Sequence, residues 1–472
     1  MKFRPGGRSG RAALLYLVLA GVQRGISLLL LPFVSQVMSP AEYGAASMLT
    51  VSALLLTTLF AAPLEQLVFR LAARGGVGAT AQLRAVGIYI YVMLPVAMAV
   101  AAIVCALWLP PIFGIAGSIW AIEIAAVGFM ATATYFALPL VRARQDLRKF
   151  AALSLTSITA IATGKILLVI VLDYGVTGWA VSDLAGGVAT TVVAVALVRI
   201  PKGRVGREAV ASATRFALPL IPHRAAFWSL SSLSRPALGV VSTLAQVGIL
   251  SFGLNLASVA NLVLAEINRA VLPHYSRETF PAPTRETARA TRVQFVLAFA
   301  VPAALAGALA AVGPVIIDRA FWPAFAPAAL LLVGQVAYGL YLLPMNYTVQ
   351  TAGKTSLSSL ASAVGAFVIL IAILVFGSRF GAMGVAVATA VGFSLMAVMA
   401  FGLTRVLRLK IRWRDSLPPR WTWCVGIAGV CAGVAALLST PQSPQAYGAG
   451  LIAVTTTITF AWLALREHRT DS

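Results

Sequence analysis

The feature that most constrains this sequence is a series of long, uninterrupted apolar runs rich in Leu, Ala and Val. Most run for roughly 18 to 28 residues, close to the ~20 that a helix needs to cross a bilayer. Within lipid, only helices and closed barrels satisfy every backbone hydrogen bond. A barrel would instead show segments of about ten residues with alternating hydrophobicity. The chain is therefore predicted to be an all-α integral membrane protein.

Composition agrees with this prediction and excludes a soluble protein. Sixty per cent of the residues are hydrophobic and 11% are charged, whereas a soluble domain carries about 25% charged residues. The three cysteines, Cys105, Cys424 and Cys431, all fall inside apolar runs. This placement favours helix packing over a disulfide or metal framework.

The apolar runs predict about fourteen transmembrane helices, near 12–38, 45–72, 85–108, 116–141, 150–172, 176–198, 215–234, 245–272, 292–313, 326–350, 357–376, 382–404, 421–439 and 446–465. The basic residues test this count, because Lys and Arg collect in cytoplasmic connections. Most of the 36 Lys and Arg residues lie at the two termini and in the even-numbered connections. The odd-numbered connections contain only Arg235, Arg319 and Arg379. We therefore expect an inner-membrane protein with both termini in the cytoplasm, whose net charge of +22 attracts anionic lipid rather than nucleic acid.

Two pairs of similar segments indicate an internal repeat. Residues 41–47 resemble 245–251, and residues 175–181 resemble 381–387, each pair about 205 residues apart. Six helices per repeat make the repeat parallel, because both halves then enter the membrane from the same side. We expect two six-helix lobes, 1–200 and 201–410, followed by an additional helix pair in 411–472. Such two-lobed architecture is typical of secondary transporters.

Charged residues inside the membrane are the strongest candidates for function, because each costs on the order of 3 kcal/mol to place at the bilayer centre. The candidates on the predicted helices are seven residues: Arg24, Glu65, Glu123, Lys165, Asp183, Arg224 and Glu266. Glu123 is expected at the interface, near the start of its helix. Lys165 and Asp183 lie on neighbouring helices and are expected to pair. Pro219 and Pro222, next to Arg224, predict a bend.

Several short motifs resemble a known family. They are Leu31–Ser35 with Met38–Gly44, Phe216–Pro219, Ser234–Arg235, the Gly-x-x-Gly starts at Gly175 and Gly381, and Gly353–Thr355. As an ordered set over about residues 10–405 they are similar to the polysaccharide-repeat flippases of the multidrug/oligosaccharidyl-lipid/polysaccharide exporter superfamily. The resemblance implies translocation of undecaprenyl-diphosphate-linked sugar units for O-antigen, capsule or exopolysaccharide synthesis. It also implies a central cavity lined by helices 1, 2, 7 and 8.

The resemblance places four of the seven charges on those cavity helices. We expect Arg24 and Arg224 to bind the diphosphate of the substrate, since the forked guanidinium matches phosphate oxygens. Glu65 and Glu266 would balance the arginines or couple an ion, with Arg70 as a further substrate contact and Asp183 and Lys165 as further coupling candidates. The alternatives are permanent salt bridges and, for Arg70 and Glu266, side chains that snorkel to the membrane surface.

No motif for catalysis, nucleotide binding or metal binding accompanies these charges, so a transporter without cofactor is expected rather than an enzyme. The expected partners are the lipid-linked oligosaccharide, membrane lipids, and the polymerase and glycosyltransferases of the same pathway. The alternatives are a lipid II-type flippase and a cation-coupled multidrug exporter of the same superfamily.

Overall fold

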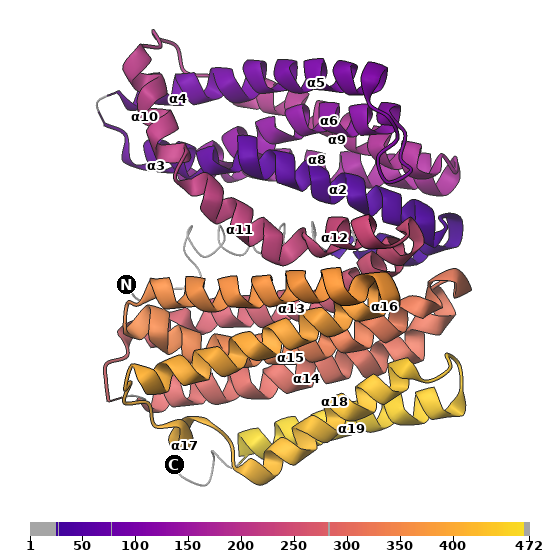
Figure 1. Cartoon of the computed structure of the whole chain (residues 1–472). Coiled ribbons are helices and arrows are strands. Elements are labelled where there is room, and N and C mark those ends of the chain that lie inside the picture. The colour runs from indigo at the N-terminus through magenta and orange to yellow at the C-terminus, as the bar shows by residue number, and fades with distance from the viewer. Residues whose placement is uncertain (1–24, 27, 77, 282–283, 467–472) are drawn as a thin grey trace. The chain divides into compact units, whose positions relative to one another are not determined.

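The computed structural model describes residues 25–26, 28–76, 78–281 and 284–466 of the chain (Figure 1). Over these residues the chain is almost entirely helical, and its one β-type pairing is an isolated bridge between Ile112 and Ile115. The predicted all-α fold class is confirmed for this part of the chain.

The chain divides into two compact units, Met1–Pro236 and Ala237–Ser472, which are described here one at a time. The segment 207–236 belongs to the first unit. The lobe limits 1–200 and 201–410 and the additional pair in 411–472 stay predictions.

The first unit is a bundle in which α6 packs on α5 and α9, and α9 packs on α8 (Figure 1). Its helices are α2 (Pro40–Phe60), α3 (Ala62–Arg74), α4 (Ala79–Ile88), α5 (Leu94–Trp108), α6 (Gly117–Thr132), α7 (Leu138–Ala143), α8 (Leu147–Lys165), α9 (Gly175–Leu197), α10 (Arg207–Ala217) and α11 (Leu220–Ser232). Three π-helical turns continue these helices: η1 (Tyr89–Met93), η2 (Ala133–Ala137) and η3 (Ile166–Val171).

The second unit is built around α14, which packs on α13, α15, α18 and α19. The helix α12 (Ser234–Val241) crosses the division between the units. The remaining elements are α13 (Leu244–Arg277), α14 (Arg285–Ile316), η4 (Arg319–Ala324), α15 (Phe325–Asn346), η5 (Tyr347–Thr351), α16 (Thr355–Val406), α17 (Trp413–Ser416), α18 (Arg420–Leu438) and α19 (Pro444–Arg466).

Eleven helices among the described residues are long and apolar enough to cross a membrane. The chain is therefore a multi-pass membrane protein. One of the eleven, α16, consists of two antiparallel helices that correspond to the predicted spans 357–376 and 382–404, because its backbone reverses at Gly381 (φ 54°). The first predicted span, near 12–38, lies largely outside the described residues, so the total of fourteen stays a prediction.

The internal repeat reappears as the same local structure in each unit. In the first unit, Ser39 caps α2 and forms a reciprocal capping box with Glu42. In the second, Thr243 caps α13 and accepts a hydrogen bond from the backbone of Gln246. Each N3 side chain also reaches a glycine with positive φ: Glu42 lies against Gly175, and Gln246 lies against Gly381 and accepts a hydrogen bond from the backbone N–H of Ala382 (2.9 Å).

Two breaks interrupt the long helices near the candidate charges. The α2–α3 segment breaks at Ala61 (φ −126°), two residues before Pro63. The bend expected from Pro219 and Pro222 is present as a gap between α10, which ends at Ala217, and α11, which starts at Leu220. A proline removes one backbone donor and crowds the preceding turn, which explains both interruptions.

Candidate functional site: two intramembrane charge clusters

The first cluster is an ion pair between Glu65 on α3 and Arg224 on α11. The guanidinium Nη2 lies 3.5 Å from the carboxylate Oε2, and the side chains of Arg224 and Glu65 are 28% and 33% exposed, respectively. Both residues were singled out from the sequence, and the structure brings them together within the first unit. A pair this accessible keeps part of its hydration, and its partners can exchange.

The helix breaks position both members of this pair. Glu65 falls in the first turn of α3, directly after the break at Ala61. The partial positive charge of a helix N-terminus stabilises a carboxylate at that place. Arg224 follows the break before α11, and the indole of Trp228, one turn further on, donates a hydrogen bond to the carbonyl of Val51 on α2 (3.1 Å). This contact holds α11 against α2, and the Glu65–Arg224 pair forms beside it.

The second cluster joins Lys165 of α8 to Asp183 of α9. Lys165 Nζ lies 3.3 Å from Asp183 Oδ1 and 3.6 Å from the centre of the Trp179 ring. Both charged side chains are largely buried. The expected pairing of Lys165 and Asp183 is confirmed, and Trp179 adds a cation–π contact that the sequence did not single out.

Glu123 of α6 completes this cluster. Its expected position at the membrane interface stays a prediction. The residue is only 2% exposed, and its Oε2 has no hydrogen-bond partner. It interacts electrostatically with both Asp183 and Lys165. Within the residues that the structure describes, the cluster therefore contains two carboxylates and one ammonium group.

Small residues on α8 and α9 let three helices approach closely enough to form this cluster. A Cβ on Gly164 of α8 would lie 3.0 Å from Ser182 Cβ, so the backbones of α8 and α9 nearly touch beside Lys165 and Asp183. On the other side of α9, Gly187 leaves the same kind of space for Met130 of α6 (3.0 Å). Close approach at small residues is the usual packing mode of membrane helices.

The other predicted site residues lie elsewhere. Glu266 pairs with Arg269 one turn further along α13, in the second unit, and both side chains are well exposed. The Arg70 guanidinium stacks over the Phe216 ring at 5.6 Å. Arg24 lies outside the described residues. Whether any of these residues binds substrate or an ion stays a prediction.

The second unit contains a buried polar network that the sequence analysis missed. Tyr275 donates a hydrogen bond to Gln294 Oε1 (2.7 Å), and Asn268 Oδ1 accepts bonds from Gln294 (2.7 Å) and Asn346 (2.8 Å). Thr291 bridges Tyr275 (2.8 Å) and Tyr347 (3.2 Å). Uncharged polar residues are common in apolar runs, so only the convergence of α13, α14, α15 and η5 reveals this network. Its bonds are made within the unit, which fits a packing role.

Among the described residues, no group of three or more His, Cys, Asp and Glu side chains is arranged to hold a metal ion. In the second cluster the Lys165 ammonium lies against the Asp183 carboxylate, where a cation would otherwise bind. This donor set fits a proton or an internal ion pair better than a metal, since a hard cation needs about six oxygen ligands.

Comparison with known proteins identifies the fold. No protein-family model and no curated protein matches the sequence. Among solved structures, the lipid II flippase MurJ in an inward closed conformation is similar with a TM-score of 0.71 and 13% identity, over 96% of this chain and 99% of that one. An inward-facing multidrug resistance MATE family transporter of the MOP superfamily has a TM-score of 0.58 and 14% identity, over 82% of this chain and 94% of that one.

A MOP superfamily transporter from Pyrococcus furiosus is also similar, with a TM-score of 0.50 and 15% identity over 84% of this chain and 95% of that one. At such low identities the likeness concerns the fold alone. The chain has the fold of the MurJ and MATE transporters of the MOP superfamily.

Proposed function

We propose that the chain is a secondary transporter that flips undecaprenyl-diphosphate-linked oligosaccharide repeat units across the inner membrane for cell-surface polysaccharide synthesis. The observation that carries this proposal is the accessible Glu65–Arg224 pair, placed between two interrupted helices. A guanidinium group presents two parallel N–H donors that match the oxygens of a phosphate. The sugar class comes from the motif resemblance.

The pair suggests how binding and release alternate. Without cargo, Glu65 neutralises Arg224 at 3.5 Å. An entering diphosphate, with more negative charge than one carboxylate, displaces Glu65 and takes the guanidinium. When the cargo leaves, Glu65 returns, so Arg224 is never left as an unpaired charge in a medium where that is costly. Arg24 and Arg70 are proposed as further diphosphate contacts, and Glu266 with Arg269 as an exchangeable pair in the second unit.

A lipid II-type flippase is the second candidate, and one observation favours it. The similarity to the lipid II flippase MurJ extends over 96% of this chain. Lipid II, as an undecaprenyl-diphosphate glycan, would present the same diphosphate to Arg224, so the two proposals differ in the glycan. A cation-coupled multidrug exporter is the third candidate. It is less favoured, because an organic cation needs a negatively charged partner and would be repelled by the positive charge of Arg224.

We further propose that the Glu123–Lys165–Asp183 cluster, rather than Glu65 or Glu266, couples transport to an ion. It is buried and holds one more carboxylate than ammonium, so it can take up one proton without leaving a net charge. Each charge moved across 100 mV supplies about 2.3 kcal/mol. Glu123→Gln would remove this proton site, and we expect the transport rate to lose its dependence on the pH gradient.

The proposed setting is the bacterial inner membrane with both termini in the cytoplasm, among anionic lipids and beside the glycosyltransferases and polymerase of the pathway. The distribution of basic residues supports this orientation. No nucleic acid is proposed as a partner.

The test begins in a strain that lacks the chromosomal copy and any second flippase. Surface polymer is expected to be lost, with lipid-linked oligosaccharide accumulating in the inner leaflet, and wild type is expected to restore both. Arg224→Ala, at matched expression, should lower the flipping rate about 10- to 100-fold, because a hydrogen bond to a charged group contributes about 1.5–3 kcal/mol. Arg224→Lys should retain part of the activity, and Arg207→Ala, exposed at the start of α10, should behave as wild type.

Purified protein in vesicles then separates the candidates by cargo. We expect flipping of the oligosaccharide-linked lipid, slowed by Arg224→Ala. Faster flipping of lipid II, slowed by the same substitution, would replace the first candidate by the second. Uptake of an organic cation without movement of either lipid, or normal polymer in the deletion strain, would refute the flippase proposal.

A further inference from the structure

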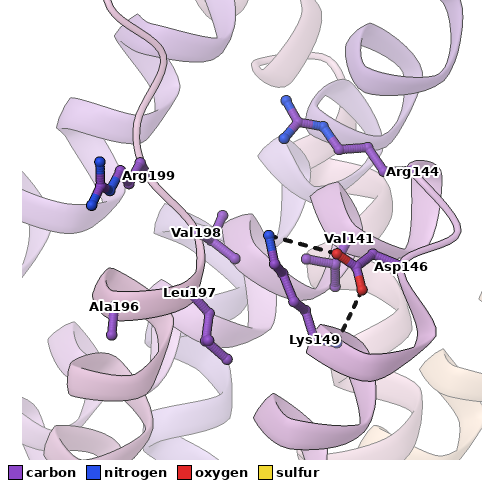
Figure 2. A pocket seen from close by; sticks show the side chains of 8 residues that line it. All are labelled: Val141, Arg144, Asp146, Lys149, Ala196, Leu197, Val198 and Arg199. Atoms are coloured by element: carbon purple, nitrogen blue, oxygen red, sulfur yellow. Dashed lines mark hydrogen bonds and ion pairs between the residues drawn. The ribbon is translucent and has the colours of Figure 1, made fainter.

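A pocket separate from both charge clusters opens at one end of the first unit (Figure 2). It has a volume of about 420 Å3 and lies between the end of α7, the start of α8 and the end of α9. Its floor is apolar and includes the buried side chains of Val141 and Val198. Its rim carries the charged residues Arg144, Asp146, Lys149 and Arg199. An apolar floor under a charged rim is an amphipathic site.

The rim has an excess of positive charge that the described residues do not neutralise. Lys149 is paired with Asp146, with Nζ 3.6 Å from Oδ2, and its backbone N–H donates to Oδ1 of the same carboxylate (3.2 Å). The guanidinium groups of Arg144 and Arg199 form no hydrogen bond or ion pair with any residue that the structure describes. In Figure 2 Arg144 and Lys149 extend from one side of the opening, and Arg199 lies on the other. Two guanidinium groups without a described partner therefore lie at the rim of the same pocket.

The chain fixes both sides of this opening. Asp146 caps the start of α8. Across the pocket, the segment after α9 is held by Tyr91, whose hydroxyl donates to the carbonyl of Val198 (3.4 Å), and by Arg84, which donates to the carbonyl of Pro201 (3.0 Å). Arg199 therefore leaves the bundle from an anchored backbone, so the pocket is a built feature of the fold.

An exposed apolar stripe leads along α9 to the pocket. Val188, Val192 and Val195 are all exposed and follow the helical spacing of four and three residues. The stripe ends at Val195, two residues before the end of α9, and Arg199 follows in the segment beyond the helix, at the pocket rim. In a membrane-spanning helix such a stripe contacts acyl chains, so an acyl chain lying on it would bring its own headgroup to the rim. A free phosphate would use the rim alone and leave the stripe and the apolar floor unexplained.

We propose that this basic pocket binds the phosphate of an anionic membrane phospholipid. The phosphate lies between Arg144 and Arg199, the glycerol backbone rests on Val198 and Leu197, and an acyl chain follows the valine stripe of α9. Basic pockets at the ends of membrane helices are suited to anionic headgroups, because the surface potential and the guanidinium donors act together. The bound lipid would tie the α7–α8 connection to the segment after α9. This inference does not depend on the proposed cargo.

The test uses the full-length chain, purified, stripped of lipid and probed by native mass spectrometry and thermal shift. The added probes are phosphatidylglycerol, phosphatidylcholine with the same acyl chains, and inorganic phosphate. We expect phosphatidylglycerol to remain bound and to raise the melting temperature. Arg144→Ala/Arg199→Ala should weaken this binding about tenfold or more. Arg204→Ala/Arg207→Ala removes the same charge from the same region outside the pocket and should bind as wild type.

Three results would overturn the proposal. Equal weakening in both double variants would mean diffuse attraction without a site. Equal retention of phosphatidylcholine, whose headgroup has no net charge, would mean that the pocket does not select an anionic headgroup. Equal stabilisation by inorganic phosphate would make the pocket a soluble-anion site. Arg144→Lys/Arg199→Lys, which keeps the charge, should retain most of the binding and shows whether a loss in the alanine variant comes from misfolding.

Discussion

Lys165 is the positively charged partner of two carboxylates, because Glu123 and Asp183 both interact with it inside the first unit. The three residues are therefore unequal. Without Lys165 two buried carboxylates would face each other, whereas without Asp183 the ammonium group would still have Glu123 as a partner. Removing one member of a buried pair costs about 3–5 kcal/mol when the other charge is left uncompensated.

This asymmetry gives an order of destabilisation. We expect Lys165→Met to lower the stability by about 3 kcal/mol or more, and Asp183→Asn by clearly less. Adding Glu123→Gln to Lys165→Met should restore part of the loss, since it removes one of the two opposed carboxylates. Thermal unfolding in detergent, followed by tryptophan fluorescence, measures the order. Equal effects of the two single substitutions would show that Glu123 does not act as the second partner.

At the residue scale the sequence located the charges within the helices better than it predicted their surroundings. The Lys165–Asp183 pair followed from two neighbouring helices, and both ends of the Glu65–Arg224 pair were singled out separately. The burial of Glu123 inside the bundle was not predicted. Its burial depends on packing against α9, which a single run of apolar residues does not reveal.

Among the elements, α18 and α19 depend on small residues for their contact with α14. A Cβ on Gly307 of α14 would lie 2.8 Å from the carbonyl oxygen of Gly450, and one on Gly433 of α18 would lie 2.8 Å from Ala306 Cβ. Neither position has room for a larger side chain. The helix pair predicted as an addition to the two lobes is thus packed closely onto α14.

A leucine at this contact should loosen the helix pair. We expect Gly433→Leu to cost about 1–3 kcal/mol through overpacking and to speed proteolysis in the connection 407–419. Gly448→Leu is the matched control, because a Cβ at Gly448 meets nothing within 4 Å, and it should leave both the melting temperature and the proteolysis rate unchanged. Equal melting temperatures for the two variants would contradict the close contact.

Glu278, in the connection between α13 and α14, gives the fold a pH dependence. Burial of its carboxylate favours the neutral form. Hydrogen bonds from the hydroxyls of Thr287 and Thr284 and from the backbone N–H groups of Thr284 and Thr279 outweigh that effect and lower the pKa of Glu278. A lowered pKa adds stability above the ordinary value of about 4.3, and this stability is lost as the pH falls through the folded-state value.

Glu278→Gln should remove that contribution. We expect the variant to be less stable than wild type at neutral pH, with the difference shrinking as the pH falls from about 5 towards 3, since wild type then also loses its charged form. Melting temperatures across that range measure the effect. Glu208→Gln, exposed at the start of α10, should parallel wild type. A constant difference between wild type and Glu278→Gln would refute the assignment.

Prolines and glycines made part of the element structure predictable. Pro219 and Pro222 predicted the interruption of helix 7, because a proline ring acts locally. The break at Ala61 was missed, since Pro63 tolerates either a kink or a new helix start. The two halves of α16 were expected as separate spans, and the structure confirms this: the backbone reverses at Gly381, and Gly392 of the second half packs against Ile369 of the first.

For the whole molecule, the basic residues predict a single orientation. In a background with Cys105, Cys424 and Cys431 replaced by Ala, we expect Arg319→Cys to react with a membrane-impermeant thiol reagent in spheroplasts. Arg408→Cys should react only after permeabilisation, because its connection collects Lys and Arg. The opposite pattern would invert the topology, and reaction of both cysteines would contradict the predicted helix count between them.

The two-unit organisation was visible in the sequence only through the repeat. The short apolar match of residues 41–47 with 245–251 is informative because the helix start in each unit has the same three features. These are a capping residue, an N3 side chain and a contact of that side chain with a distant glycine. Features that depend on contacts between distant parts of the sequence could not be recognised in this way. The polar network of the second unit and the basic pocket both require helices far apart in the sequence to converge, and their residue types are ordinary for a membrane protein.

The capping contact of the first unit also joins two of its helices at one end. Glu42 caps the beginning of α2 and lies against Gly175, the first residue of α9, so the two helices meet at that end. Beyond the break at Ala61, α3 is a separate helix, and Glu65 lies in its first turn, close to the break. A small rotation of α3 would therefore move Arg74 at its far end widely while shifting the carboxylate by little. The ion pair with Arg224 would then hold α3 in place until a stronger anion binds the guanidinium.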